Sequence, residues 1–88
     1  MITHYKGKKI HYKTQRLAAE LYNAMYTYRL FTGNRIYGPA STDDTIVDWL
    51  YHHNRQLHDR VVKCSNYWPV IESCVYQYAD HFPQDLER

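Results

Sequence analysis

The sequence is poor in the residues from which phosphate-binding loops and metal sites are built. Its three glycines, at positions 7, 33 and 38, match neither a P-loop nor a Gly-x-Gly-x-x-Gly dinucleotide turn. Its two cysteines, Cys64 and Cys74, lie too far apart for the Cys-x2-4-Cys pair of structural zinc sites. No apolar run approaches the roughly 18 residues of a membrane span. These absences exclude the common nucleotide-binding loops, zinc ribbons and a membrane-spanning segment.

The composition instead indicates a small folded domain. The 88 residues are 44% hydrophobic and 16% aromatic, with ten tyrosines, which is unlike the composition of a disordered chain. A chain of this length has room for one core, so we predict a single domain over residues 1–88. The first residues, MITHYKGKKIHYK, lack the apolar segment of a signal peptide. We therefore expect a soluble, cytoplasmic protein.

Charge is unevenly distributed along the chain. Residues 1–40 contain seven basic side chains and one acidic side chain, whereas residues 41–88 contain four basic and eight acidic ones. Such asymmetry is typical of proteins that bind nucleic acid or acidic protein surfaces, because the local potential steers association. The alternative is that the two halves neutralise each other in the fold.

Turn and cap residues predict a mainly α (α+β) fold, in which an N-terminal β-hairpin or basic arm precedes a three-helix bundle. In residues 1–13, β-branched and aromatic residues flank Gly7, which favours a hairpin; a disordered basic arm is the alternative. The three helices occupy residues 14–83, and the polar tail 84–88 is expected to fray.

Each helix has its own start and stop signals. The first runs from a Thr14 cap to the stop at Gly33, the second from a cap at Ser41 or Thr42 to about residue 61, and the third from about Pro69 to Pro83. Apolar periodicity predicts the centre of the core, which comprises Leu21, Met25, Trp49, Leu57 and Tyr78.

The first predicted helix carries a second apolar flank outside its core stripe. Tyr22 and Tyr26 lie one turn apart, with Arg29 beside them, and Tyr51 and Tyr76 also fall outside the core stripes of their helices. Tyrosine and arginine dominate protein-interface hot spots, so we predict these five as protein-interface residues. Either a partner or a second copy of the chain covers the flank, or the rest of this small protein wraps it.

The N-terminal segment interleaves cations with aromatic rings. Cations contact phosphates and rings stack on unpaired bases, so this pattern predicts a surface for nucleic acid or an acidic partner. Its predicted members are Lys6, Lys8, Lys9, Lys13, Arg16, Tyr5 and Tyr12. The alternative is a basic edge that only discourages sheet-to-sheet aggregation.

Metal binding and catalysis have weaker support in the sequence. Cys64 and Cys74 could meet His53 and His81 in the core, but free buried cysteines and hydrogen-bonded histidines are the commoner outcome. Asp48 lies one helical turn before His52, yet no nucleophile can be placed beside this pair from the sequence. We therefore expect no metal, no cofactor and no enzymatic activity.

These observations favour a small non-catalytic protein-interaction module. It would bind a larger protein or nucleoprotein complex through the aromatic helix face, with the basic segment steering it towards an acidic surface. Nucleic-acid binding through the N-terminal segment is the alternative. A compact, Tyr-rich chain without an active-site motif is similar in style to the inhibitors and accessory factors of phages and mobile elements, although this similarity covers no motif.

Overall fold

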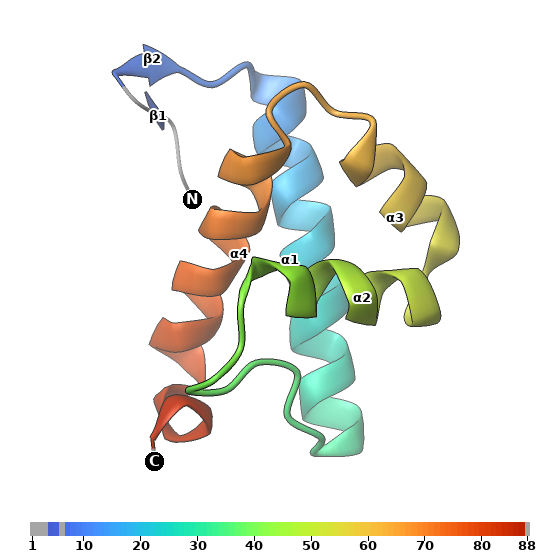
Figure 1. The fold of residues 1–88 in the computed structure, drawn as a ribbon, viewed down its shortest axis with the longest axis vertical. Helices are drawn as coiled ribbons and strands as arrows, with labels where there is room; N and C mark the ends of the chain where they lie inside the picture. The colour runs from blue at the N-terminus through green and yellow to red at the C-terminus, as the bar shows by residue number, and fades with distance from the viewer. Residues whose placement is uncertain (1–3, 6, 88) are drawn as a thin grey trace.

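The computed structural model describes residues 4, 5 and 7–87, and most of them are helical (Figure 1). The elements are β1 (His4–Tyr5), β2 (Lys8–Lys9), α1 (Tyr12–Thr32), α2 (Asp43–His53), α3 (Arg55–Val62), α4 (Tyr67–His81) and the 3-10 helix η1 (Pro83–Leu86). The predicted mainly α class is confirmed. None of the helices in these described ranges is long and apolar enough to cross a membrane.

Four α-helices take the place of the three that the sequence predicts. The expected second helix divides at Asn54, whose φ of −154° and ψ of 85° leave the helical region. The Asn54 amide still donates to the carbonyl of Leu50, which ends α2, while its side-chain oxygen accepts the amide of Leu57 at 3.1 Å and starts α3. One asparagine thus closes one helix and caps the next, which the apolar periodicity does not reveal.

A very short strand pair precedes the helices in the described residues. His4 lies opposite Lys9 and Tyr5 opposite Lys8 in an antiparallel arrangement, and Gly7 has a φ of 81°. Lys6 lies outside the described residues, so the hairpin stays a prediction. Gln15 ties the segment to α1 by donating its side-chain amide to the Ile10 carbonyl at 2.8 Å.

Helix α1 begins three residues earlier than the Thr14 cap predicts. The ring nitrogen Nδ1 of His11 accepts the amide of Lys13 at 3.2 Å and so caps the helix, while Thr14 is buried within its first turns.

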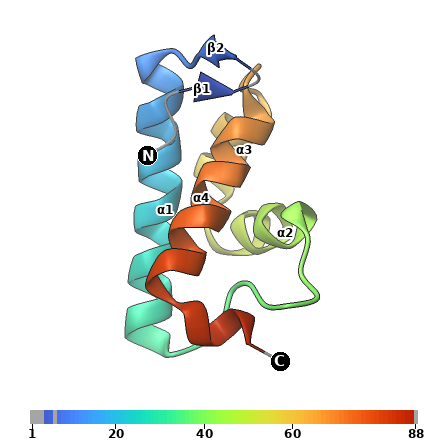
Figure 2. The same cartoon turned by 90° about the vertical axis from the view of Figure 1, so that its left-hand side faces the viewer.

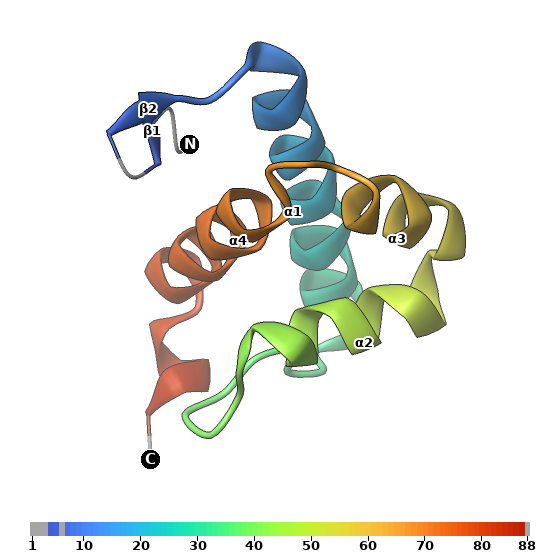
Figure 3. The ribbon, with the colours of Figure 1, turned by 45° about the horizontal axis from the view of Figure 1, so that its top comes forward.

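Helices α1 and α4 lie side by side and run in the same direction (Figures 1 and 2). Ala18 in the first half of α1 accepts a hydrogen bond from the Cys74 thiol, and Tyr22, one turn later, donates to the Gln77 carbonyl. Parallel neighbours need a crossover, and α2 and α3 supply it on the side of the pair away from the strands (Figure 3).

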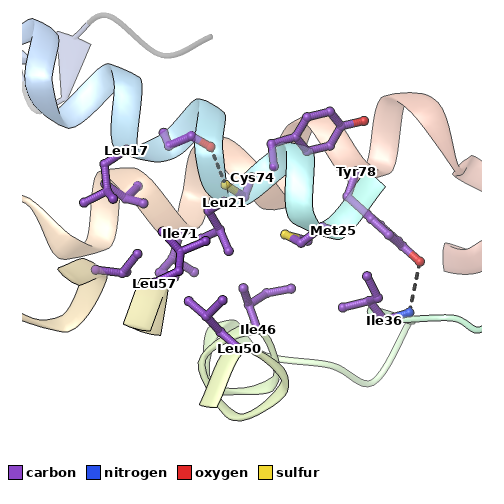
Figure 4. Packing of buried hydrophobic residues seen from close by; sticks show 14 of the residues in the cluster. Leu17, Leu21, Met25, Ile36, Ile46, Leu50, Leu57, Ile71, Cys74 and Tyr78 are labelled. Carbon is purple, nitrogen blue, oxygen red and sulfur yellow. Dashed lines mark hydrogen bonds between the residues drawn. The ribbon is translucent and has the colours of Figure 1, made fainter. Parts of the chain in front are cut away.

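The core lies between α1, α4 and the crossover helices (Figure 4). Its members with the least exposed surface include Leu21, Met25, Ile46, Leu50, Val61, Val70, Ile71, Cys74 and Tyr78. The sequence predicts four of its five core residues correctly, whereas Trp49 is only partly buried and packs at the edge of this cluster.

Residues 84–86 are helical, which corrects the prediction of a frayed tail for that part of 84–88, and Arg88 lies outside the described residues. Residues Pro83–Leu86 form η1, and Asp85 is only 5% exposed. Its carboxylate accepts two hydrogen bonds from Arg29, Nε to Oδ2 at 2.7 Å and Nη2 to Oδ1 at 2.9 Å. A bidentate arginine–carboxylate pair fixes the distance and the relative orientation of the two side chains, so η1 is held against the end of α1.

Tyr78 links the Arg29–Asp85 pair to the core and forms a polar cluster with it. Its hydroxyl donates to the Asp85 carboxylate and accepts the Ile36 amide at 3.1 Å (Figure 4). The Arg29 guanidinium lowers the pKa of Asp85, against the opposing effect of burial, while burial and the Asp85 hydrogen bond raise the pKa of Tyr78. The cluster therefore joins α1, the loop that follows it, α4 and η1.

Candidate functional site

The strongest charged surface lies where α1 begins. Lys8 and Lys9 of β2 and Lys13 and Arg16 of α1 are all exposed. The end of α3 reaches the same place, because the Thr14 hydroxyl lies 3.8 Å from the Cys64 sulfur. We call this surface the basic end and define it by Lys8, Lys9, Lys13, Arg16, Arg60 and Lys63, all of them exposed.

One acidic side chain, Glu20, lies among the cations of the basic end. Glu20 pairs with Arg60 at 2.6 Å, and both line a hollow of about 310 Å³ together with Lys13 and Arg16. The acidic residues Asp80, Asp85 and Glu87 belong to the end of α4 and the segment after it, at the opposite end of the long axis (Figure 1). Arg29 and Arg35 lie near Asp85 at that same end, so the fold keeps the charge asymmetry of the sequence only in part.

Two aromatic rings lie among these cations. Tyr12 is 59% exposed, and its ring centroid lies 4.9 Å from that of His11 with 30° between the planes. Both rings line a hollow of about 680 Å³ with Lys9, Ile10 and Gln15. Of the other predicted members of this surface, Tyr5 belongs to β1, and Lys6 lies outside the described residues.

The predicted aromatic flank of α1 is largely covered from within the chain. Tyr22 is 8% exposed, and its ring lies 5.7 Å from that of His81. Arg29 holds Asp85, and its guanidinium lies 5.0 Å from the Phe82 ring. Of the two alternatives for this flank, wrapping by the rest of the chain therefore holds at Tyr22 and Arg29, because α4 and η1 cover them.

The other predicted interface residues keep exposed surface but do not gather in one place. Tyr26 is 36% exposed beside His81 and Phe82. Tyr51, on α2, is 44% exposed, and the Arg55 guanidinium lies 4.2 Å from its ring. Tyr76 is exposed on α4. These tyrosines belong to three different helices.

The structure separates the residues that a metal site would need. Cys74 is buried, which raises the pKa of its thiol to about 12, whereas Cys64 lies near Thr14 at the other end of α3 from His53. His53 and His81 are exposed; His81 Nδ1 lies 3.1 Å from the Gln77 carbonyl, as the hydrogen-bonded alternative predicts, and His53 stacks on Trp49. Among residues 4, 5 and 7–87, no three His, Cys, Asp or Glu side chains come together in a metal-binding arrangement.

The carboxylate–imidazole pair that the sequence suggests is present on the surface of α2. His52 Nε2 lies 3.6 Å from Asp48 Oδ1, and the two side chains are 64% and 78% exposed. Water screens such a pair, so its geometry is that of an ordinary surface contact.

Two features have no signal in the sequence. Arg60 lines a hollow with Lys13 and Arg16, and Lys63 precedes Cys64, which lies beside Thr14, although more than 40 residues separate these parts of the chain. Tyr28, Trp49 and His53 form a ring cluster, with Trp49 and His53 stacked at 5.1 Å, beside a hollow of about 440 Å³. Both features depend on how helices pack, which periodicity within one helix does not specify.

Comparison with known proteins adds no assignment: no protein-family model, curated protein or solved structure matches this chain.

Proposed function

We propose that this protein is a non-catalytic binding module and that its basic end binds nucleic acid. One observation carries the proposal: exposed cations from β2, α1 and α3 share one end of the molecule, and the glutamate among them is already paired with Arg60. Lysine and arginine side chains contact phosphates at variable spacing and without regard to base sequence, so this arrangement is suited to the backbone of a nucleic acid. Exposed rings beside the cations support the same function.

The proposal predicts a steep dependence of affinity on salt. Suppose that the five cations other than Arg60 each displace one counterion from a phosphate. A plot of log Kd against log salt concentration then has a slope of about 3.5 to 4.5, so binding weakens as salt rises. Raising salt from 50 to 200 mM is then expected to weaken binding about 100-fold or more. Fluorescence anisotropy of a labelled oligonucleotide measures this directly.

Alanine substitutions distinguish the basic end from general positive charge. Lys9→Ala and Lys13→Ala are each expected to weaken binding and to lower the salt slope by about one phosphate contact. Arg35→Ala removes one exposed cation from the loop at the other end of α1 and is expected to change neither. Absence of binding at low salt, or equal losses in all three variants, would exclude the basic end as a nucleic-acid surface.

The exposed apolar side chains at the end of α1 support a second candidate, the binding of a larger protein. Phe31 is 86% exposed and Leu30 is 56% exposed, with Tyr26 one turn before them. An apolar group of this kind at one helix end is a frequent feature of protein-interaction surfaces. This surface replaces the Tyr22 and Arg29 flank as the place where a protein partner would dock.

A capture experiment separates the two candidates. The protein and its Phe31→Ser variant are used as baits in a host extract, before and after nuclease treatment. Protein docking at the end of α1 predicts a partner that survives nuclease and is lost from the Phe31→Ser bait, with a Tyr76→Ser bait as the control for an exposed ring elsewhere. A partner released by nuclease, or one retained equally by all three baits, contradicts docking at this surface.

A further inference from the structure

Tyr12 is distinguished from the other exposed tyrosines by its surroundings. Tyr76 is exposed to a similar degree, 67% against 59%, whereas Tyr12 lines a hollow together with Lys9 of the basic end. Arg16 follows Tyr12 by one helical turn, so the two side chains project from neighbouring points of α1. A ligand that contacts these cations therefore meets the Tyr12 ring.

The ring next to Tyr12 is fixed before any ligand arrives. His11 Nδ1 accepts the Lys13 amide at 3.2 Å, and this cap sets the orientation of the imidazole at the start of α1. The two rings are tilted by 30°, close to an offset stack. A partner ring can extend this stack at small cost in side-chain entropy, because one of its members is already held.

The hollow beside the rings has an apolar floor and a polar wall. Ile10 is 4% exposed, and Gln15 is held by its bond to the Ile10 carbonyl. The volume, about 680 Å³, falls within the range of about 300 to 1,000 Å³ that small-molecule sites occupy. A flat heterocycle fits a hollow with this lining, since it presents an apolar face to the rings and polar edges to the wall.

Cations and rings together discriminate between forms of nucleic acid. Phosphates are available on duplexes and on single strands, so the lysines alone do not distinguish them. Base faces are available only where bases are unpaired and unstacked, and aromatic side chains bind them with little sequence preference. We propose that the basic end binds single-stranded nucleic acid in preference to duplex, with Tyr12 and His11 stacking on an unpaired base; this inference rests on the proposed function.

The test compares single strands and duplex on the same variants. The probes are a fluorescein-labelled single-stranded DNA of mixed sequence, its RNA counterpart and the duplex formed with the complementary DNA, all measured by anisotropy at low salt. Tyr12→Ala and Tyr12→Leu are expected to weaken binding of both single strands at least about fivefold, and binding of the duplex less than about twofold. Tyr12→Phe keeps the ring and is expected to bind like the wild type. Tyr76→Ala is the control, and circular dichroism verifies that each variant is helical.

The outcomes separate the inference from the proposed function. Equal losses for single strands and duplex, equal wild-type affinity for both, or failure of Tyr12→Phe to retain binding overturns base stacking, while the proposed function stands. Absence of binding to all three probes at low salt overturns both. Wild-type preference for single strands that disappears in Tyr12→Ala and Tyr12→Leu supports the inference.

Discussion

Replacing Asp85 with alanine is expected to lower the Tm of the protein by about 10 °C, because it leaves the buried Tyr78 hydroxyl without its acceptor and releases η1 from Arg29. An orphaned buried hydrogen-bonding group costs about 1 to 3 kcal/mol, which is a large share of the stability of so small a domain. Differential scanning calorimetry measures the change.

Two tyrosine variants provide the matched comparison. Tyr78→Phe removes the hydroxyl that joins Asp85 to the Ile36 amide, so it is expected to lower Tm as well. Tyr76→Phe makes the same chemical change on the exposed side of the same helix and is expected to leave Tm unaltered. An Asp85→Ala protein that melts within about 2 °C of the wild type would show that the tail contributes little to the fold.

The Asp85 carboxylate makes the stability of the fold depend on pH in the acid range. The pKa of Asp85 in the folded protein lies below the ordinary value of 3.8. Its contribution to the free energy of unfolding is therefore complete above about pH 3.8 and is lost as pH falls through the pKa of the folded state. Wild-type Tm is therefore expected to fall more steeply than that of Asp85→Asn below about pH 4. Asp59, whose pKa His58 and Arg55 lower, titrates in both proteins and cancels in the difference.

Reversing the charge of Lys13 and Arg16 together is expected to weaken nucleic-acid binding by at least about 100-fold at low salt. Both side chains are exposed and line the same hollow between α1 and α3, so the glutamates of a Lys13→Glu, Arg16→Glu protein would repel a phosphate placed there. Acidic residues in the first turns of a helix interact favourably with its dipole, and the fold is expected to be retained.

Arg55→Glu is the control for this variant. It reverses one exposed charge at the start of α3, away from the basic end, and is expected to keep most of the affinity. Anisotropy gives the affinities, and a thermal melt verifies that the double variant is folded. Binding by the folded double variant within about threefold of the wild type would show that phosphates are bound elsewhere on the molecule.

The sequence predicts what is local and misses what depends on packing. The helix ends at Gly33 and near Pro83, the apolar stripes and the basic N-terminal segment are recognisable because each depends on neighbouring residues. Tyr22 cannot be placed in the same way. Its burial depends on α4 lying parallel to α1, and nothing in the pattern of α1 specifies that neighbour.

Contacts between polar residues that are distant in the sequence explain the other wrong predictions. Arg29 resembles an interface residue and Asp85 a tail residue, because they lie 56 positions apart and the sequence does not reveal their contact. Likewise, Lys63 reaches the basic end only because Asn54 turns α3 back towards the start of α1. Each contact joins residues that no helical period relates.

Whether the basic end is the binding surface can be measured by two-dimensional NMR, in which amide chemical shifts are followed during a titration. The labelled protein is titrated with single-stranded DNA at low salt. If DNA binds the basic end, the shifted amides are expected to cluster in residues 8–16 and 60–64, at one end of the long axis. Shifts confined to residues 26–31 or 49–54, or no shifts at any DNA concentration, would contradict it.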